Sequence, residues 1–424
     1  MHKILLLGSG GREHAFALKL GKSKKCQALF IAPGNAGTAA CGENVPINPL
    51  DFDAVAQFVR ENAITMVVVG PEEPLVRGIQ DYFQASPDLK DILLIGPSMA
   101  GAMLEGSKAW AKAFMGRHGI PTAAYREFTR ETLAEALAYL DSHALPVVLK
   151  ADGLAAGKGV VICDKKEAAK KEVKAMLSGK FGEASETVVI ESFLSGIEFS
   201  VFALTDGKNY QILPEAKDYK RIKDGDKGPN TGGMGAVSPV PFVDAAMWEK
   251  VEQQIIIPTI NGLRKEKITY HGFVFFGLIV VDGNPFVIEY NCRMGDPETE
   301  VVFPRLKNDL VDLLQACAKG RLKSVNIRVE PKVATTIMLV SGGYPGDYEK
   351  GKKIEGITDT KNCLVLHAGT QSNGADIVTN GGRVIAVTAL GKTIPDALKK
   401  AYRNVRKIKF DGRFYRKDIG KDLL

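Results

Sequence analysis

Long hydrophobic runs, paired cysteines and basic–aromatic clusters are all missing from this sequence of 424 residues. Its longest apolar run, residues 273–281, is far shorter than the roughly 18 residues that span a bilayer. The apolar run at residues 4–7 is too short for the core of a signal peptide. The cysteines, which form no CxxC pair and no metal-like spacing, are Cys26, Cys41, Cys163, Cys292, Cys317 and Cys363. We therefore expect a soluble cytoplasmic protein with reduced thiols and no contact with a membrane.

Excess charge of one sign is also small. The formal net charge is +7, and the aromatic residues, 8% of the chain, are not interleaved with the basic ones. This pattern favours small anionic ligands over nucleic acid as partners. The content of 45% hydrophobic and 25% charged residues is that of an ordinary globular protein, and the length allows two or three domains.

Short apolar runs bounded by glycine or proline mark the first hundred residues. They cover residues 4–7, 28–32, 66–69 and 92–95, with helical patterns between them at 53–61 and 75–83. Buried parallel strands have this appearance, so we predict an open, doubly wound parallel sheet of the α/β class. Ligands bind such sheets at the carboxyl ends of the strands.

The loop after the first predicted strand reads GSGGREH and argues against a dinucleotide. The fingerprint GxGxxG would need glycine where Glu13 stands, and the second strand ends in Ala32-Pro33 instead of an acidic residue. A glycine-lined helix N-terminus with Arg12 suits a single phosphate, and a purely structural turn is the alternative. The next loop, with Asn35 and two glycines, is a candidate nest for an anion or a sugar.

A second glycine-rich loop, residues 153–159, follows the strand that ends in Lys150. It is not a P-loop, because only three residues separate Gly153 from Gly157, Gly159 follows Lys158, and a strand replaces the helix. Such a loop between antiparallel strands can fold over a triphosphate, using backbone N–H groups and lysine charge. A flexible surface hairpin is the alternative interpretation.

The third informative segment is a predicted hairpin that turns at Asp282-Gly283-Asn284. Its second strand ends in Glu289 and Asn291, which point to one face because they are two residues apart. A carboxylate and an amide oxygen side by side suit Mg²⁺, whereas a solvated strand end is the alternative. We expect Arg293 on the same face, and we expect Pro297 to open a helix.

These and other segments follow one another in a fixed order from residue 8 to residue 420. They are GSGGREHA, PGNAGT, VGPEEPLV, LEGSKAW, LKADGLAAGKGV, GPNTGGMGA, IEYNCRMGDPETE, SGGYPGDY, HAGT, TNGGRV and YRKDIG. In this ordered set the chain resembles the glycinamide ribonucleotide synthetase (phosphoribosylamine–glycine ligase) family of ATP-grasp enzymes.

The resemblance implies a reaction of ATP, glycine and 5-phosphoribosylamine that yields ADP, phosphate and glycinamide ribonucleotide through glycyl phosphate, in purine biosynthesis. The catalytic residues would be Lys108, Lys150 and Arg293. The ATP-binding residues would be Lys108, Lys150, Gly157, Lys158, Gly159, Glu191, Ser192, Phe193, Leu194, Glu198, Arg221 and Asn230. In this set Glu191, Phe193 and Leu194 form the adenine hinge, largely through backbone groups. The ligands of Mg²⁺ or Mn²⁺ would be Glu289 and Asn291.

The substrate-binding residues implied by the resemblance belong to two groups. The ribose phosphate would lie on Gly10, Gly11, Arg12, Glu13, Asn35, Gly37 and Thr38. The ammonium group of glycine would be received by Asp218 or Asp296. Many ATP-grasp enzymes carry a second acidic metal ligand on the strand before the E-x-N pair, but residues 273–281 contain no carboxylate. The number of ions therefore stays open.

The resemblance further implies three domains. They are an open α/β domain at residues 1–104, an ATP-grasp domain at 105–329 with a mobile lid at about 121–193, and a small α/β cap at 330–424. In the cap we expect strands at 335–340, 363–366 and 384–390 and a helix at 393–408. We expect a monofunctional enzyme. Transient contact with the enzyme that precedes it in the pathway, to transfer the unstable amine, is left open.

Three other functions are weighed beside this one. An ATP-grasp enzyme with another acceptor, such as a carboxylase, would release ADP in response to bicarbonate. A dinucleotide oxidoreductase is disfavoured by Glu13 and Pro33. A nucleotide sensor without enzymatic activity would bind ATP and turn nothing over.

Overall fold

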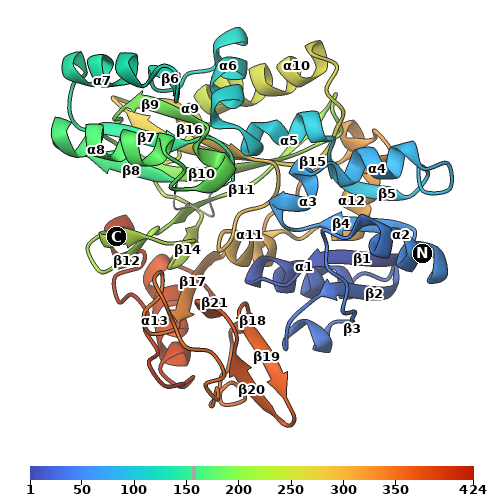
Figure 1. Ribbon diagram of the computed structural model, residues 1–424. Coiled ribbons are helices and arrows are strands. Elements are labelled where there is room, and N and C mark those ends of the chain that lie inside the picture. The colour runs from blue at the N-terminus through green and yellow to red at the C-terminus, as the bar shows by residue number, and fades with distance from the viewer. Residues whose placement is uncertain (155–158) are drawn as a thin grey trace.

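The N-terminal part folds into the parallel sheet that its apolar runs predict (Figure 1). The computed structural model describes residues 1–154 and 159–424. The N-terminal strands run parallel in the order β5-β4-β1-β2-β3. The elements of this part are β1 (His2–Gly8), α1 (Gly11–Gly21), β2 (Cys26–Pro33), β3 (Glu43–Asn44), α2 (Phe52–Glu61), β4 (Met66–Val69), α3 (Glu72–Val76), α4 (Ile79–Ala85) and β5 (Leu93–Pro97).

One predicted helix is wrong in its extent. The pattern at residues 75–83 is divided between α3 and α4, because the chain turns at Gly78. Gly78 has φ of +83°, a left-handed conformation that glycine adopts without the steric cost of a side chain. The predicted helix at 53–61 is confirmed as α2, whose first turn is capped by the Asp51 carboxylate accepting from Ala54 N at 3.0 Å.

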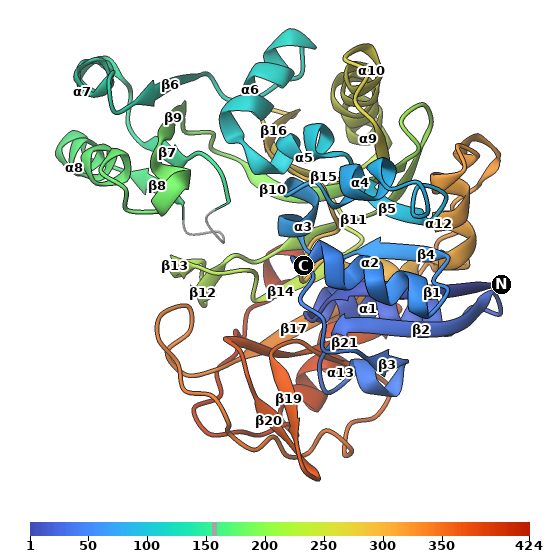
Figure 2. The ribbon, with the colours of Figure 1, turned by 45° about the vertical axis from the view of Figure 1, so that its right-hand side comes forward.

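Strands β6 to β9 form a separate four-stranded sheet, and the body built from this sheet with α7 and α8 is called the lid here (Figure 2). Its strands are antiparallel in the order β6-β9-β7-β8. Its hydrophobic core, which includes Phe128, Leu140, Leu149 and Val173, is distinct from the two larger cores of the molecule. The segment comprises α5 (Met99–Gly106) and α6 (Lys108–Arg117), which lead into β6 (Tyr125–Thr129), α7 (Leu133–Ser142), β7 (Val147–Ala151), β8 (Val160–Cys163), α8 (Lys166–Leu177) and β9 (Thr187–Ser192).

The central part is mainly antiparallel and contains the predicted hairpin. Asp282 and Gly283 both have positive φ, +47° and +72°, as the turn chemistry predicts. Strand β15 of the hairpin pairs with β10 and with β16, and β12 and β13 form a small ribbon of their own. The elements are β10 (Ile197–Thr205), β11 (Tyr210–Asp218), β12 (Arg221–Lys223), β13 (Lys227–Asn230), β14 (Gly235–Ser238), α9 (Ala245–Val251), α10 (Ile257–Lys265), β15 (Tyr270–Val281) and β16 (Asn284–Asn291).

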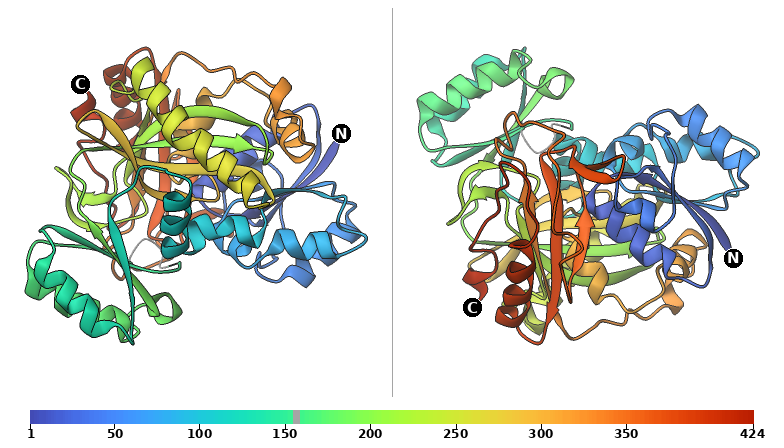
Figure 3. Two further views of the ribbon diagram at one scale, coloured as in Figure 1. Left: turned by 90° about the horizontal axis from the view of Figure 1, so that it is seen from above. Right: turned by 90° about the horizontal axis from the view of Figure 1, so that it is seen from below.

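The C-terminal part carries the predicted strands and helix, but its main sheet is not separate. Strand β17 pairs with β14, and β15 pairs with β5, so thirteen strands share one sheet through all three parts (Figure 3). The elements are β17 (Val333–Val340), β18 (Leu364–His367), β19 (Thr370–Asn373), β20 (Asp376–Thr379), β21 (Arg383–Gly391) and α13 (Ile394–Val405). In the described residues no helix is both long enough and apolar enough to cross a bilayer.

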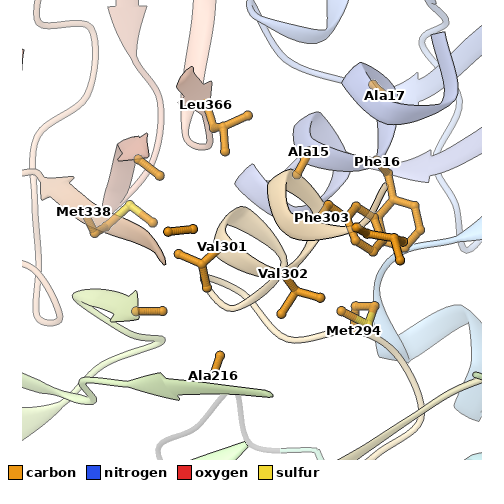
Figure 4. Close-up of a cluster of buried hydrophobic side chains, with 14 of the residues drawn as sticks. Ala15, Phe16, Ala17, Ala216, Met294, Val301, Val302, Phe303, Met338 and Leu366 are labelled. Atoms are coloured by element: carbon orange, nitrogen blue, oxygen red, sulfur yellow. The ribbon is translucent and has the colours of Figure 1, made fainter. Parts of the chain in front are cut away.

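Helix α11 (Thr299–Arg305) occupies the centre of the largest core, followed by α12 (Leu310–Ala318). Figure 4 shows Phe303 beside Phe16 of α1 and Val301 on the side of Met338. The two phenylalanine rings meet edge to face, with centroids 4.6 Å apart. The prediction that Pro297 opens this helix is wrong, because the helix begins at Thr299 with Glu298 as its N-cap. The short loop before α11 therefore directs its side chains toward the cleft described next.

Candidate active site

A cleft of about 940 Å³ collects residues from the lid, the central sheet and the loop before α11. Most of the residues predicted to bind ATP, metal or glycine line it. They are Lys108, Lys150, Gly159, Glu191, Ser192, Phe193, Leu194, Glu198, Asp218, Arg221, Asn230, Glu289, Asn291, Arg293 and Asp296. Gly157 and Lys158 lie outside the described residues.

Lys150 and Glu191 form a buried ion pair within the lid sheet. The Lys150 ammonium lies 3.0 Å from Glu191 Oε1 and also donates to the Ile288 carbonyl at 3.0 Å. Lys112 of α6 contacts the other oxygen, Glu191 Oε2, at 2.9 Å. All three side chains are at most 5% exposed. The Glu191 side chain thus binds two lysines inside the protein, whereas the sequence analysis gave it a largely backbone role.

Lys112 is a residue that sequence reasoning missed. It donates to Thr122 Oγ1 at 2.8 Å, and burial lowers its pKa to about 8 although Glu191 opposes the shift. Lys112 lies one helical turn after Lys108, so the two lysines share a face of α6. That spacing could have identified Lys112 as a second lysine of the site.

Lys108 stands at the first turn of α6, where it faces the lid. Its ammonium donates to the Gly153 carbonyl at 2.8 Å, and burial lowers its pKa although Glu289 opposes this. Asp152 holds the same turn by accepting from Ser107 Oγ at 2.9 Å and from Ala109 N at 3.1 Å. The first turn of α6 and the end of β7 are therefore fixed to each other.

Glu289 and Asn291 end β16 and face the cleft as predicted from their spacing. Glu289 is partly exposed, and its nearest cation is Lys220 at 3.9 Å. On β15 the residue opposite Glu289 is Gly277, which supplies no oxygen side chain. In the described part of the chain no group of three or more His, Cys, Asp or Glu residues is placed to hold a metal. The Glu289–Asn291 oxygen pair fits a hard cation whose other ligands are water and phosphate.

Asp218 and Glu298 form an acidic patch beside this pair. Glu298 is 4% exposed and accepts from Ser200 Oγ at 3.3 Å. Burial and, next, the nearby Asp218 raise the Glu298 pKa to about 8. Burial also raises the pKa of Asp218, although Lys220 opposes the shift. Sequence reasoning missed Glu298, because its acidic partner lies about eighty residues away in the chain.

Arg293 does not share a face with Glu289 and Asn291, since β16 ends at Asn291. Its guanidinium is turned toward the N-terminal part. There it contacts Glu105 Oε1 at 2.6 Å and Glu72 Oε2 at 3.2 Å. These carboxylates raise the Arg293 pKa, although burial opposes them.

One part of the cleft carries exposed apolar side chains. Phe193 is 39% and Ile197 51% exposed, and both line the cleft. Across it, Arg221 and Asn230 are paired residues of the β12–β13 ribbon. Glu198 contacts Lys220 at 3.0 Å, which lowers the pKa of its carboxyl group.

The loops predicted to hold the ribose phosphate meet at the carboxyl end of the parallel sheet. Their donors are already used within the protein: Gly10 N donates to Glu13 Oε2 at 2.6 Å, and Gly37 N to Asn35 Oδ1 at 2.8 Å. Arg12 is 7% exposed and contacts Glu13 at 2.6 Å. Thr38 N also donates to Asn35, and Gly11 lies against Glu300. Of these residues only Arg12 lines the cleft.

The C-terminal part closes this junction with residues that the sequence analysis did not select. Arg383 contacts Asp296 at 3.0 Å, and Asp296 accepts from Arg12 N at 3.4 Å. The Asn35 amide donates to the His367 carbonyl at 2.9 Å. Asp296 therefore has two protein partners, the Arg383 guanidinium and the Arg12 backbone N–H. In the described residues no protein hydrogen bond to the Asp218 side chain is found.

Comparisons with known proteins cover the whole length of this fold. The chain matches the three domains of phosphoribosylglycinamide synthetase: the N domain over residues 2–105, the ATP-grasp (A) domain over 106–299 and the C domain over 334–422. It is 46% identical over 423 residues to a phosphoribosylamine–glycine ligase of Vibrio vulnificus, covering 98% of this chain and 97% of that protein. A relative of the same name in Chlorobaculum tepidum is 45% identical over all of both chains.

Solved structures agree with these sequence matches. The crystal structure of phosphoribosylamine–glycine ligase from Thermotoga maritima has a TM-score of 0.85 and 36% identity, covering 98% of this chain and 99% of that one. A biotin carboxylase of Campylobacter jejuni, 15% identical with a TM-score of 0.71, shares the fold alone. The expected fold class is thus confirmed, and the chain belongs to the phosphoribosylglycinamide synthetase family.

Proposed function

We propose that this chain ligates glycine to 5-phosphoribosylamine, converting ATP to ADP and phosphate and releasing glycinamide ribonucleotide for purine biosynthesis. One observation carries the proposal: a single cleft combines Lys108 and Lys150, the Glu289–Asn291 pair and Arg293. Family membership over all three domains supports it. A carboxylate is a poor electrophile, so glycine would be phosphorylated first. The amine would then attack glycyl phosphate, forming the C–N bond as phosphate leaves.

The nucleotide would lie between the lid and the central sheet. Lys108 and Lys150 would hold its phosphates, and the cleft that they line supports this assignment. The exposed ring of Phe193, with the backbone of Ser192 and Leu194, would receive the adenine. Glu198 would accept from the ribose hydroxyls, and Arg221 with Asn230 would close the opposite wall.

Glu289 and Asn291 would hold Mg²⁺ or Mn²⁺. When bound, the ion would neutralise phosphate charge and align the phosphoryl group for transfer. The chain supplies the remaining positive charge through its own lysines and Arg293, which act by position and electrostatics.

For the ammonium group of glycine we prefer Asp218 to Asp296. Asp296 is already held by Arg383 and by Arg12 N. Asp218 lines the cleft beside the buried Glu298, and burial above all raises the pKa of both carboxyl groups, because their charged forms lack solvation there. An ammonium group placed between them would stabilise those charged forms.

Phosphoribosylamine would approach from the N-terminal loops. Gly10, Gly11, Arg12, Glu13, Asn35, Gly37 and Thr38 would shape its site. Because several of their donors are engaged within the protein, phosphate binding there requires exchange of the Gly10–Glu13 or Gly37–Asn35 hydrogen bonds. The amine would meet glycyl phosphate near Asp296, which joins these loops to the cleft.

The proposal includes the division at residues 1–104, 105–329 and 330–424, with the lid at about 121–193. The distinct hydrophobic core of the lid supports this last element. It also includes a cytoplasmic location and, for the unstable amine, transient contact with the preceding enzyme of the pathway.

The decisive experiment measures ADP formation with each substrate omitted in turn. Full turnover should require ATP, a divalent cation, glycine and phosphoribosylamine, generated in place from ribose 5-phosphate and ammonia. ADP release that depends on bicarbonate and ignores glycine would overturn the proposal in favour of a carboxylase.

A further inference from the structure

The guanidinium of Arg293 is held from two sides by carboxylates of α3 and α5. Glu105 Oε1 lies 2.6 Å from Arg293 Nη2, and Glu72 Oε2 lies 3.2 Å from Nε. Arg293 Nη1 also donates to the Met294 carbonyl at 3.4 Å. An arginine carries five N–H donors in one plane, so three fixed contacts define that plane. Two donors are left for a ligand in the cleft, which Arg293 lines.

Glu105 is itself held in place. It is the penultimate residue of α5, and its side chain is 7% exposed. Its second oxygen, Oε2, accepts from Cys292 N at 2.8 Å and from Cys292 Sγ at 3.2 Å. Because Cys292 precedes Arg293, Glu105 fixes the backbone and the side chain of this short segment at once. The second carboxylate, Glu72, begins α3, and its side chain is 32% exposed.

These contacts answer a physical requirement of the site. A buried guanidinium needs compensating charge, and an arginine that acts on a transferred phosphoryl group needs a fixed orientation. An arginine on the solvated surface would have neither such partners nor a fixed orientation. Neither Glu72 nor Glu105 has a role in the proposed function, although both belong to segments of the ordered set, VGPEEPLV and LEGSKAW.

We propose that Glu105, assisted by Glu72, is a positioning residue that orients Arg293 for phosphoryl transfer to glycine. The proposal rests on the proposed function, because it takes Arg293 to act on the transferred group. It also links the N-terminal part to the chemistry. Arg12 donates to the same Met294 carbonyl at 3.2 Å, so both arginines share one anchor beside the substrate loops.

A double-mutant cycle tests this inference. The variants are Glu105→Gln, Arg293→Lys and the double variant, with Glu215→Gln as the control. Glu215 is also a buried glutamate, accepts from Val240 N at 3.0 Å and is absent from the cleft lining. We expect Glu105→Gln to lower kcat roughly 10- to 100-fold, as misplacement of a catalytic group does. The ADP dissociation constant should stay within about twofold, because the nucleotide contacts lie elsewhere, and Glu215→Gln should keep full turnover.

The cycle separates positioning from a merely structural role. If Glu105 acts through Arg293, adding Glu105→Gln to Arg293→Lys should lower kcat by less than about threefold more. Multiplying effects, or a normal kcat in Glu105→Gln while Arg293→Lys is impaired, would overturn the inference. Should Glu105→Gln fail to fold, Glu72→Gln takes its place in the same cycle, because that side chain is half-buried. Full activity of Arg293→Lys would show that Arg293 has no part in the proposed function, and the inference would fall with it. A wild-type chain that is inactive with glycine would overturn the proposed function itself.

Discussion

Asp218 and Glu298 show how burial turns ordinary carboxyl groups into sensitive ones. Both line the cleft, and burial disfavours the charged form of each. Nearby carboxylates add to this effect, because Asp218 acts on Glu298, and Glu198 and Glu289 act on Asp218. Lys220 offsets part of this charge near Asp218. Raised carboxyl pKa values of this kind are typical of a cation-binding site that holds no cation.

The free energy of unfolding, measured as a function of pH, should reveal the raised pKa of Glu298 directly. With its pKa raised to about 8, Glu298 keeps a proton in the folded chain that the unfolded chain releases above the ordinary value of 4.5. The free energy of unfolding should therefore fall as pH rises from about 4.5 to 8, by at most about 1.4 kcal/mol per pH unit from this group. Glu298→Gln should lack this loss. It should match wild type near pH 5 and exceed it at pH 8 in urea unfolding, and parallel curves at all pH values would contradict the assignment.

Site residues that follow a clear local pattern could be predicted from the sequence. Site residues whose role depends on contacts with distant parts of the chain could not. Glu289, Asn291 and Lys150 each lie within the last three residues of a strand whose apolar run is plain in the sequence. Lys112 and Glu298 gain their character from side chains far away in the chain, which no local pattern reveals. The same holds for the Glu105–Arg293 contact, whose members are 188 residues apart.

At the scale of elements, turn chemistry was predictable and packing was not. The Asp282-Gly283 turn was predicted because its residues tolerate positive φ. The break between α3 and α4 lies at Gly78, whose positive φ interrupts an apolar pattern that suited one continuous helix. Helix α11 begins at Thr299, two residues after Pro297. Contacts between elements also carry function, since Glu191 of β9 joins Lys150 of β7 to Lys112 of α6.

Replacement of Lys150 by methionine tests this junction. We expect turnover to fall at least about 100-fold, because a phosphate-binding charge is lost. We also expect about 1–3 kcal/mol of destabilisation, because one oxygen of the buried Glu191 carboxylate loses its partner while Lys112 still compensates the charge. The double variant Lys150→Met with Glu191→Gln should be less stable again in thermal unfolding, because it also removes the carboxylate that compensates the buried Lys112, and its ADP release should stay low. Lys170→Met, which breaks only the surface pair with Asp141, should change stability by no more than about 1 kcal/mol and leave turnover intact.

At the scale of the molecule, one sheet of thirteen strands joins the three parts. Among the described residues, the four-stranded sheet of the lid stands apart and has a hydrophobic core of its own. The sequence implied the three parts through its resemblance to the family. It did not predict that β14 pairs with β17 and β15 with β5, because pairing between edge strands depends on how finished domains meet. The consequence is one continuous frame that carries β16 with its Glu289–Asn291 pair, and the lid is a smaller, separate body.

This asymmetry predicts how the molecule opens. The small core of the lid should make β7, β9 and α8 exchange their amide hydrogens faster than β10 and β15, which lie inside the large sheet. ADP with Mg²⁺ at about 100 times its dissociation constant should slow exchange in the lid by up to about 100-fold, corresponding to about 2.7 kcal/mol, if lid opening releases the nucleotide. Strands β1 and β17 serve as the internal reference, because none of their residues lines the cleft and they should not respond. Equal protection of lid and frame without nucleotide, or equal slowing of β17 and β9 on its addition, would mean that the lid does not open as a separate unit and that nucleotide enters by another route.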